Sequence, residues 1–490
     1  MRVFARRHNS QSIGGRQVPV QIRPARALQT LRKGNAPIGE VPPDNQLSSM
    51  DHAMFTLLRS MDRVAVVQCV WVYEHPVDFE ALKRFHHNLG YGLLGRRIER
   101  SPLPFARHRW VCDRGPAEMD VAERPRPRGE LSDWIDERAQ EPIDPERGPA
   151  WRLGVLPLTD GSTAVSLVAS HCLIDGLGMG LAVAEAAIGK TRDLGYPPPH
   201  SRTRLRALAQ DARQTVRGAP EVGRALAGAA RAARRRRQEQ APASTPSRSV
   251  AAGSGCGDER VVVPAIAIHV DLDQWDERAD ALGGTSHHLA AGFAAKLGER
   301  MGRRRSGDGA VTLQIPLSDR SEHDTRANTL SFVSVSVDPS RVTTNLSPTR
   351  AAIKQVFNTL RETPDVASPM LPLAPLVSFV PKRALKRLAE ATFGYDDLPV
   401  ACSSLGDLAA VAACPDGTEA EYAFGGGVIQ RVMREHLERH GELSLVFVRI
   451  SGKMCITVVA YQAGEVCSKP QLRELAARTL AEFDLSGVIE

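Results

Sequence analysis

The 490-residue chain lacks several features that would assign it to large classes of protein. No run of residues approaches the roughly 18 consecutive apolar positions of a membrane-spanning helix, so we expect none. Basic residues begin the chain, but no apolar segment follows them as in a secretory signal peptide. The eight cysteines include no C-x-x-C pair, so neither a zinc site nor a disulfide scaffold is indicated. The expected location is the reducing cytoplasm, with attachment to the inner face of the membrane as an alternative.

Aromatic residues are also scarce, at 5% of the chain, while the formal net charge is +7. The basic runs contain no interleaved aromatic side chains, and no nucleic-acid recognition motif is present, so no nucleic-acid partner is expected. Residues 1–45 are rich in arginine and poor in acids. Their amphipathic pattern is weak, which favours a disordered basic arm over an organellar presequence.

The rest of the chain predicts two mixed α/β halves joined by a basic linker. In the first half, residues 46–196, a β-branched and aromatic run at 64–73 predicts a buried strand, and the apolar spacing at 78–90 predicts a helix. The second half, residues 259–490, repeats this alternation, with strands at 261–271, 311–317 and 332–337 and a hairpin at 443–461. The expected fold class is therefore α/β (α+β), with two domains.

The linker, residues 197–258, changes to arginine, alanine, serine and proline. Residues 205–237 predict a helix with a thin apolar stripe, and residues 241–257 are of low complexity. Three interpretations of the helix remain open: a solvated crossover, a contact with an anionic membrane surface, or a site for a partner protein.

A polar segment that follows an apolar run carries the strongest sign of chemistry. Residues 164–169 predict a strand, and Ser170 and His171 follow it, with Asp175 and Gly176 four and five residues after the histidine. A histidine at a strand end can serve as the general base that acyl transfer requires. The alternatives are a purely structural histidine, or a nucleophile at Cys172.

This segment resembles the His-His-x-x-x-Asp-Gly motif of the condensation-like acyltransferase superfamily, which includes chloramphenicol acetyltransferase, peptide-synthetase condensation domains and bacterial wax ester synthase/diacylglycerol acyltransferases. Other segments resemble the last of these in the right order; they are residues 47–55 (LSSMDHAMF), 142–153 (PIDPERGPAWRL), 316–320 (PLSDR) with 328–332 (NTLSF), and 441–461. Ser170 replaces the first motif histidine. His287 and His288 replace an Asn-Asp pair, and no third ligand accompanies them, so no metal is expected.

The resemblance implies a fold of two chloramphenicol acetyltransferase-like halves that meet in a V with a central tunnel. It assigns the general base to His171 and a loop-bracing carboxylate to Asp175, whose partner would be an arginine of the first half, Arg96 or Arg97. Gly176 would allow the chain to turn into the following helix. The candidate substrate-binding residues are Ser318, Asn328, Ser331 and Ser404. For the first three the alternative is a simpler role, the capping of turns and strand ends. Residues 403–408 are expected to cross the cleft as a latch.

Three functions are compatible with this resemblance. The first is an O-acyltransferase that moves an acyl group from acyl-coenzyme A to a fatty alcohol, a diacylglycerol or a related hydroxyl acceptor. The second is a stand-alone condensation enzyme whose donor is bound to the phosphopantetheine of an acyl carrier protein and whose product is an ester or an amide. The third is a non-catalytic protein that binds an acyl lipid. In the first two the acyl thioester is a substrate, and no cofactor is expected.

Overall fold

The computed structural model describes residues 44–239, 259–321, 323–362, 371–381, 384–385 and 398–490. The predicted basic arm, apart from its last two residues, and the low-complexity residues 241–257 lie outside these ranges. All the described residues belong to one compact unit, Ile38–Glu490. None of the helices within the described ranges is long and apolar enough to cross a membrane.

Helices and strands alternate along the first part of the chain, as predicted. In order they are α1 (Ser49–Ser60), β1 (Val64–Tyr73), α2 (Phe79–Leu89), η1 (Gly92–Leu94), β2 (Arg96–Glu99), β3 (Arg109–Cys112), β4 (Asp120–Val121), η2 (Arg128–Glu130), α3 (Leu131–Ala139), β5 (Trp151–Pro157), β6 (Thr163–Ser170), α4 (Gly176–Ala187) and α5 (Arg204–Glu239). The predicted strand at 64–73 is confirmed in full, and the predicted helices at 78–90 and 205–237 are confirmed to within a few residues.

The second part repeats the alternation. Its elements are β7 (Arg260–Val261), β8 (Ala265–Asp271), α6 (Leu272–Ala281), α7 (Ser286–Arg300), β9 (Val311–Ser318), β10 (Leu330–Val337), α8 (Ser347–Glu362), η4 (Leu371–Phe379), β11 (Val400–Asp407), η5 (Ala410–Ala413), β12 (Tyr422–Gln430), β13 (Val432–Met433), α10 (Arg434–His440), β14 (Glu442–Ile450), β15 (Lys453–Tyr461), α11 (Lys469–Glu482) and β16 (Val488–Ile489). The predicted hairpin is formed by β14 and β15.

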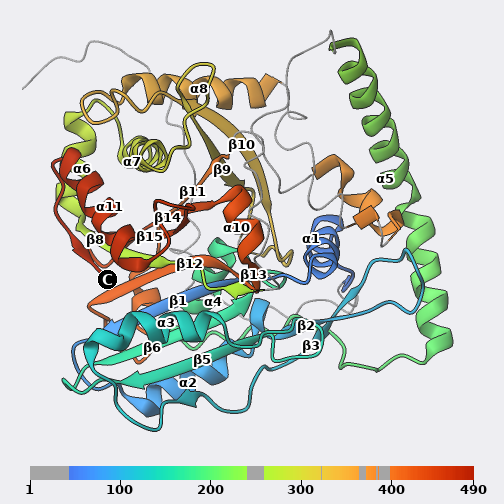
Figure 1. Ribbon diagram of the computed structural model, residues 1–490. Helices are drawn as coiled ribbons and strands as arrows, with labels where there is room; N and C mark the ends of the chain where they lie inside the picture. Colours follow the sequence, from blue (N-terminus) through green and yellow to red (C-terminus); the bar gives the residue numbers. More distant parts are fainter. Residues whose placement is uncertain (1–43, 240–258, 322, 363–370, 382–383, 386–397) are drawn as a thin grey trace, which may run out of the picture. The chain divides into compact units, whose positions relative to one another are not determined.

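Two large sheets organise these elements, which confirms the mixed α/β class (Figure 1). The first sheet has the order β12-β1-β6-β5-β4, and the second has the order β10-β9-β11-β14-β15-β8-β16. In the first sheet, alternate residues of β1 point to opposite faces. Trp71 packs against Phe85 of α2, whereas Val70 and Val72 pack against α3. In the second sheet, Trp275, Phe293, Phe447 and Phe483 join the strands to α6, α7 and α11.

One strand of the first sheet comes from the second part of the chain. β12 pairs antiparallel with β1 over nine residues, from Val64 opposite Gln430 to Val72 opposite Tyr422, and the two strands lie side by side in Figure 1. Glycines allow its close approach: a Cβ on Gly425 would lie 2.9 Å from the carbonyl oxygen of Gln68, and one on Gly426 would lie 2.8 Å from Cγ2 of Thr457. Thr457 of β15 also donates a hydrogen bond to the carbonyl of Gly425, which ties the second sheet to β12.

The prediction that residues 403–408 cross the cleft as a latch is wrong. Residues 403–407 belong to β11, which lies inside the second sheet between β9 and β14 and is parallel to both. The segment that crosses from the second part of the chain to the first sheet is β12. Its three consecutive glycines, residues 425–427, hide it from a strand search based on β-branched and aromatic residues.

Candidate active site

His171 lies where the central strand of the first sheet ends. Every residue of β6 is buried, and the strand ends at Ser170. A turn follows, and α4 begins at Gly176 with Asp175 as its N-cap; the Asp175 carboxylate accepts a 2.8 Å hydrogen bond from the backbone N–H of Gly178. His171 is only partly buried, and its own N–H donates to the carbonyl of Ala65 in β1 at 2.8 Å. The predicted placement of a histidine between a strand end and a helix N-terminus is confirmed.

Ser170 closes the turn on which His171 sits. Its side chain is buried, and its Oγ accepts a hydrogen bond from the N–H of Cys172 at 3.2 Å, while its carbonyl accepts from Leu173. A hydroxyl therefore occupies the position of the first motif histidine and stabilises the turn locally. Burial raises the pKa of the Cys172 thiol to about 12, which disfavours the thiolate that a cysteine nucleophile requires.

The imidazole of His171 is not held by a carboxylate. Its Nδ1 is buried and has no hydrogen-bond partner among the described residues. The backbone around the ring is held instead: Asn328 Nδ2 donates to the carbonyl of His171 at 3.0 Å, and this asparagine comes from the second part of the chain. Of the predicted substrate-binding residues, Asn328 is the one that directly contacts His171.

The Asp175 carboxylate is fully buried and paired with Arg320. Arg320 Nη2 lies 2.8 Å from Oδ2 and its Nε lies 3.1 Å from Oδ1, a two-pronged arrangement in which both side chains are almost completely buried. Thr329 adds hydrogen bonds from its N–H and its hydroxyl. All these contacts hold the loop, so the geometry supports the bracing role expected for Asp175. The expected partner is wrong: the arginine comes from the second part of the chain, not from Arg96 or Arg97.

Arg96 and Arg97 differ sharply although they are neighbours on β2. Arg96 is completely buried; it donates to the carbonyl of Leu173 at 2.9 Å and to that of Thr325, and it stacks 3.9 Å from the centre of the Trp110 ring. Burial lowers the pKa of Arg96. Arg97 points to the opposite face of the ribbon, where its Nε lies 3.5 Å from Asp113. Arg96 therefore supports the histidine turn, and Arg97 does not.

Replacing Arg96 with methionine is expected to lower the free energy of unfolding by about 2–4 kcal/mol, because one buried and one partly buried carbonyl lose a charged donor. Arg97→Met is the matched control and should cost under about 1 kcal/mol, since its ion pair is partly exposed. Denaturant unfolding followed by circular dichroism measures both. Equal losses for the two variants would contradict the assignment of Arg96 to the turn.

Asp51 is a site residue that the sequence did not single out. Its carboxylate is buried in α1 and accepts hydrogen bonds from the N–H groups of Ala327, at 3.1 Å, and Asn328, at 2.9 Å. Burial raises the pKa of Asp51, against the effect of these two donors. Asp51 thus orients the residue that holds the His171 carbonyl. A signal was present, because Asp51 and Arg320 both lie within segments that resemble the superfamily.

The remaining predicted substrate-binding residues lie further from the histidine. Ser318, at the end of β9, shares a 2.8 Å hydrogen bond with the hydroxyl of Thr329, which in turn contacts Asp175. Ser331 pairs with Leu317 in the β9–β10 ladder. Ser404 on β11 shares a 2.9 Å hydrogen bond with Nδ1 of His287. None of these three contacts His171 among the described residues.

The two adjacent histidines at the start of α7 have separate partners. His288 Nδ1 accepts a 3.1 Å hydrogen bond from the N–H of Thr285, which caps the helix, while His287 reaches Ser404. The described ranges contain no group of three His, Cys, Asp or Glu side chains placed to bind a metal ion.

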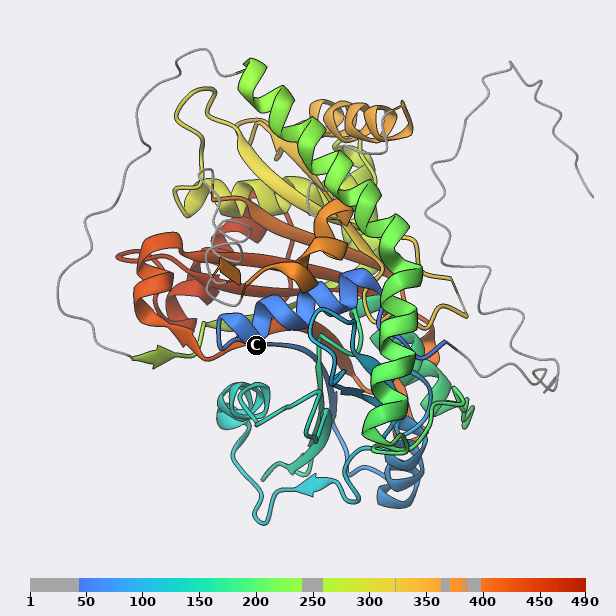
Figure 2. The same ribbon diagram turned by 90° about the vertical axis from the view of Figure 1, so that its right-hand side faces the viewer.

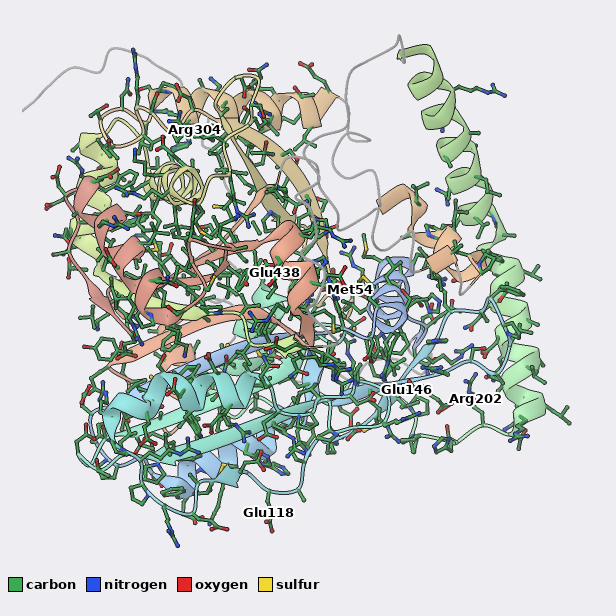
Figure 3. The ribbon with its side chains drawn as sticks, in the orientation of Figure 1. Met54, Glu118, Glu146, Arg202, Arg304 and Glu438 are labelled. Atoms are coloured by element: carbon green, nitrogen blue, oxygen red, sulfur yellow. The ribbon has the colours of Figure 1, made fainter. Side chains whose placement is uncertain are left out.

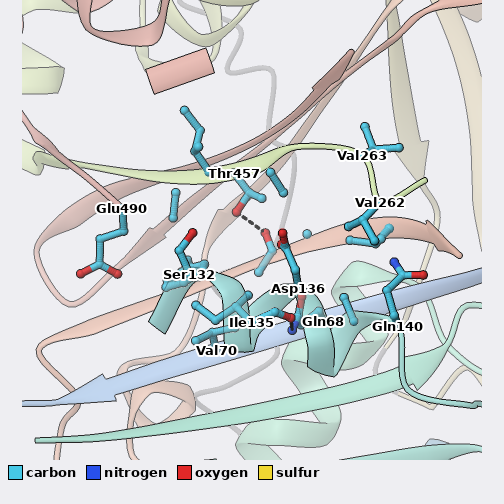
Figure 4. Close-up of a pocket in the computed structure, with 18 residues that line it drawn as sticks. Gln68, Val70, Ser132, Ile135, Asp136, Gln140, Val262, Val263, Thr457 and Glu490 are labelled. Carbon is cyan, nitrogen blue, oxygen red and sulfur yellow. Dashed lines mark hydrogen bonds between the residues drawn. The ribbon is translucent and has the colours of Figure 1, made fainter. Parts of the chain in front are cut away.

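A separate cavity lies between α3, β12 and the segment before β8 (Figure 4). Its walls are mostly apolar, with Gln68, Asp136 and Gln140 among the polar side chains that line it. Gln68 is engaged in hydrogen bonds with Ser166 and with the carbonyl of Ile135. His171 does not line this cavity, so a molecule bound in the cavity would not contact this histidine.

Part of the chain matches the model of a known family. The model of the wax ester synthase/diacylglycerol acyltransferase catalytic domain matches residues 74–289, a range that includes His171 and Asp175 but ends before Arg320. No curated protein matches the sequence.

Two similar solved structures are of condensation domains. The structure of the first condensation domain of the calcium-dependent antibiotic synthetase with a substrate analogue has a TM-score of 0.53 and 14% identity, covering 91% of this chain and 100% of that chain. The first condensation domain of the CDA synthetase gives a TM-score of 0.51 and 13% identity, covering 91% and 99%. At this identity the likeness shows the fold, with its two chloramphenicol acetyltransferase-like halves. The chain therefore has the fold of the condensation domains, and its residues 74–289 are similar to the catalytic domain of the wax ester synthase/diacylglycerol acyltransferases.

Proposed function

We propose that the protein transfers an acyl group from a thioester donor, acyl-coenzyme A, to a hydroxyl acceptor such as a fatty alcohol or a diacylglycerol. The observation that supports this most is the His171 ring itself. Its backbone is fixed by Ala65 and Asn328, yet neither ring nitrogen is engaged by a described residue. A histidine held in this way is available to a substrate hydroxyl.

In the proposed reaction His171 acts as a general base. Because Nδ1 is buried, Nε2 is the nitrogen that would take the proton from the acceptor hydroxyl. The hydroxyl oxygen attacks the thioester carbonyl, and the tetrahedral intermediate collapses as the carbon–sulfur bond breaks. The imidazolium returns the proton to the leaving thiolate, so no covalent enzyme intermediate and no cofactor are required. A general base contributes about 10²–10⁴ to the rate, and the rest must come from alignment of the two substrates in the proposed tunnel.

The other predicted residues would act around this base. Asp175 and Arg96 would position the turn, and Gly176 would allow α4 to start next to it. A Cβ on Gly176 would lie 3.2 Å from Leu405 of β11. Ser318, Ser331 and Ser404 would line the route of a substrate, as would Asn328. The protein would work in the cytoplasm, with contact to an anionic membrane through residues 205–237.

A second candidate is a condensation enzyme whose acyl or aminoacyl donor is bound to a carrier protein. The departures from the wax ester synthase pattern favour it: Ser170 replaces a histidine, and His287 contacts Ser404 in place of the usual Asn-Asp pair. The incomplete motif also leaves a third candidate, a member that binds an acyl lipid without turnover.

The proposal predicts thiol release that depends on acceptor and on His171. We would incubate the purified full chain with a panel of acyl-coenzyme A donors and pooled alcohol, diacylglycerol and amine acceptors, and identify the products by mass. An ester formed by the wild type and not by His171→Ala supports the first candidate. Turnover only with carrier-bound donors supports the second. An amide product from acyl-coenzyme A, or equal slow release by both proteins, contradicts the proposed reaction.

A further inference from the structure

The longest helix of the described chain has a face that no other described element covers. α5 runs along the outside of the structure, as Figure 2 shows, and connects the two parts of the chain. A helix of this length that served only as a solvated connection would carry polar residues on its exposed side. The exposed side of α5 carries large apolar side chains instead.

A buried ionic network fixes the orientation of α5. Asp211 is fully buried, and it accepts hydrogen bonds from Arg109 Nε at 2.8 Å and from Arg202 Nη1 at 3.0 Å. Arg202 lies just before the helix (Figure 3). Ala207 and Ala225, on the same side of the helix as Asp211, are also buried. Because Asp211 is held from the first part of the chain, the helix cannot freely rotate to bury its other side.

The opposite side of α5 is apolar and exposed. Leu205 is 81% exposed, Val216 74%, Leu226 56% and Leu208 38%. At about 100° per residue these four side chains fall within one quarter of the helix circumference. Between residues 205 and 230 the other residues on this face are small; they are Ala209, Ala212, Ala219, Gly223, Ala227 and Ala230. We call these ten residues the outer face of α5. From residue 205 to residue 230 it contains no charged residue, and Arg234 follows on the same side of the helix; exposed apolar residues in a row of this kind mark an interaction site.

A row of arginines borders the outer face on one side. Its members follow each other at intervals of seven or four residues and so lie along one line of the helix; they are Arg206, Arg213, Arg217, Arg224 and Arg231. Within the described ranges none of the five forms an ion pair with a carboxylate. Arg224 and Arg231 contact only carbonyl oxygens of their own helix, at 3.4 Å.

We propose that α5 lies flat on an anionic lipid bilayer, with its outer face inserted among the acyl chains and its arginine row against the headgroups. Nucleic acid would satisfy the arginines but leave the leucines in water. A hydrophobic groove of a partner protein would cover the leucines but leave five cations without anions. An anionic bilayer satisfies both, because such helices combine buried apolar area with attraction to acidic lipids. The proposal does not depend on acyl transfer.

Vesicle co-sedimentation of the full-length protein tests this inference. We expect binding to vesicles of phosphatidylcholine with a quarter phosphatidylglycerol, much weaker binding to phosphatidylcholine alone, and release as salt is raised. Each arginine near the surface contributes about fivefold in affinity, so the double variant Arg213→Ala/Arg217→Ala should bind roughly 30-fold more weakly. The double variant Val216→Asp/Leu226→Asp should lose binding to both vesicle types.

Matched controls separate the helix from general surface effects. Val121→Asp changes a valine that is 45% exposed on β4, and Arg478→Ala removes an exposed arginine on α11; neither should alter vesicle binding. All variants should keep the wild-type thermal midpoint, since each changed side chain is exposed or paired only at the surface.

Three results would overturn the proposal. The first is absence of the wild type from the pellet with anionic vesicles. The second is equal binding to neutral and anionic vesicles. The third is wild-type binding by Val216→Asp/Leu226→Asp. Light scattering without lipid tests whether a second copy of the chain covers the outer face instead. If the wild type forms dimers, the Val216→Asp/Leu226→Asp variant is monomeric and no vesicle is bound, then the outer face pairs two copies of the chain. The lipid assignment would then be wrong.

Discussion

Arg320→Ala is expected to lower the free energy of unfolding by about 3–5 kcal/mol, because it leaves the Asp175 carboxylate buried without a cation. The pair is joined at 2.8 and 3.1 Å, and Asp175 has no exposed surface. Arg320 also donates to the carbonyls of Arg326 and Ala327, which lose their donor in the variant. The loss therefore combines an unpaired charge with two unsatisfied acceptors, and urea unfolding would measure it.

The adjacent loop offers a matched control. Arg326 pairs with Asp324, whose side chain is 8% exposed, but the Arg326 side chain itself is 42% exposed, so Arg326→Ala should cost under about 2 kcal/mol. The double variant Asp175→Asn/Arg320→Met should be less destabilised than the sum of its single variants, because it removes both buried charges together. Strict additivity of the two single losses would show that the two side chains do not act as a pair.

His171→Ala is expected to lower kcat/KM by about 10²–10⁴ with little change in stability. We expect activity and stability to separate at this position because the ring makes no hydrogen bond to the described residues, so its loss removes packing but no hydrogen bond. The turn is held through the backbone of His171 and through Ser170, Leu173 and Asp175, all of which the variant keeps. The measurements are the thioester assay and thermal unfolding on the same preparation.

His87→Ala is the control for this variant, since His87 is an exposed histidine of α2 outside the site. Its turnover should equal that of the wild type. A His171→Ala protein that unfolds several degrees below the wild type would assign the histidine to stability rather than to chemistry. A stable His171→Ala protein with full activity would remove the general base from the mechanism.

Local patterns predicted much of this fold because they report on local structure. The run at 64–73 is β-branched and aromatic, and it is β1 to the residue. His171 was placed correctly for the same reason: the apolar strand before it and the Asp-Gly after it determine a strand end and a helix cap within a dozen residues. Asn328 was also expected near the site, and it contacts the His171 carbonyl.

What could not be predicted depends on contacts between distant segments. Arg320 lies 145 residues from Asp175, and no periodicity connects the two. The choice between Arg96 and Arg97 depends on which face of the short β2–β3 ribbon meets the histidine turn, and adjacent residues of a strand point to opposite faces. β12 was missed because glycine weakens a strand pattern, although at 425 and 426 glycine is what allows the strand to fit.

The pairing of β12 with β1 has a consequence for synthesis of the protein. The first sheet needs a strand that leaves the ribosome only near the end of translation, and at ~5–20 residues per second the delay is on the order of tens of seconds. During this time β1, a valine-rich strand, has one edge open to other chains. The nascent first half is thus the aggregation-prone species, and its yield in a cell should depend on chaperone capacity more than on the stability of the finished protein.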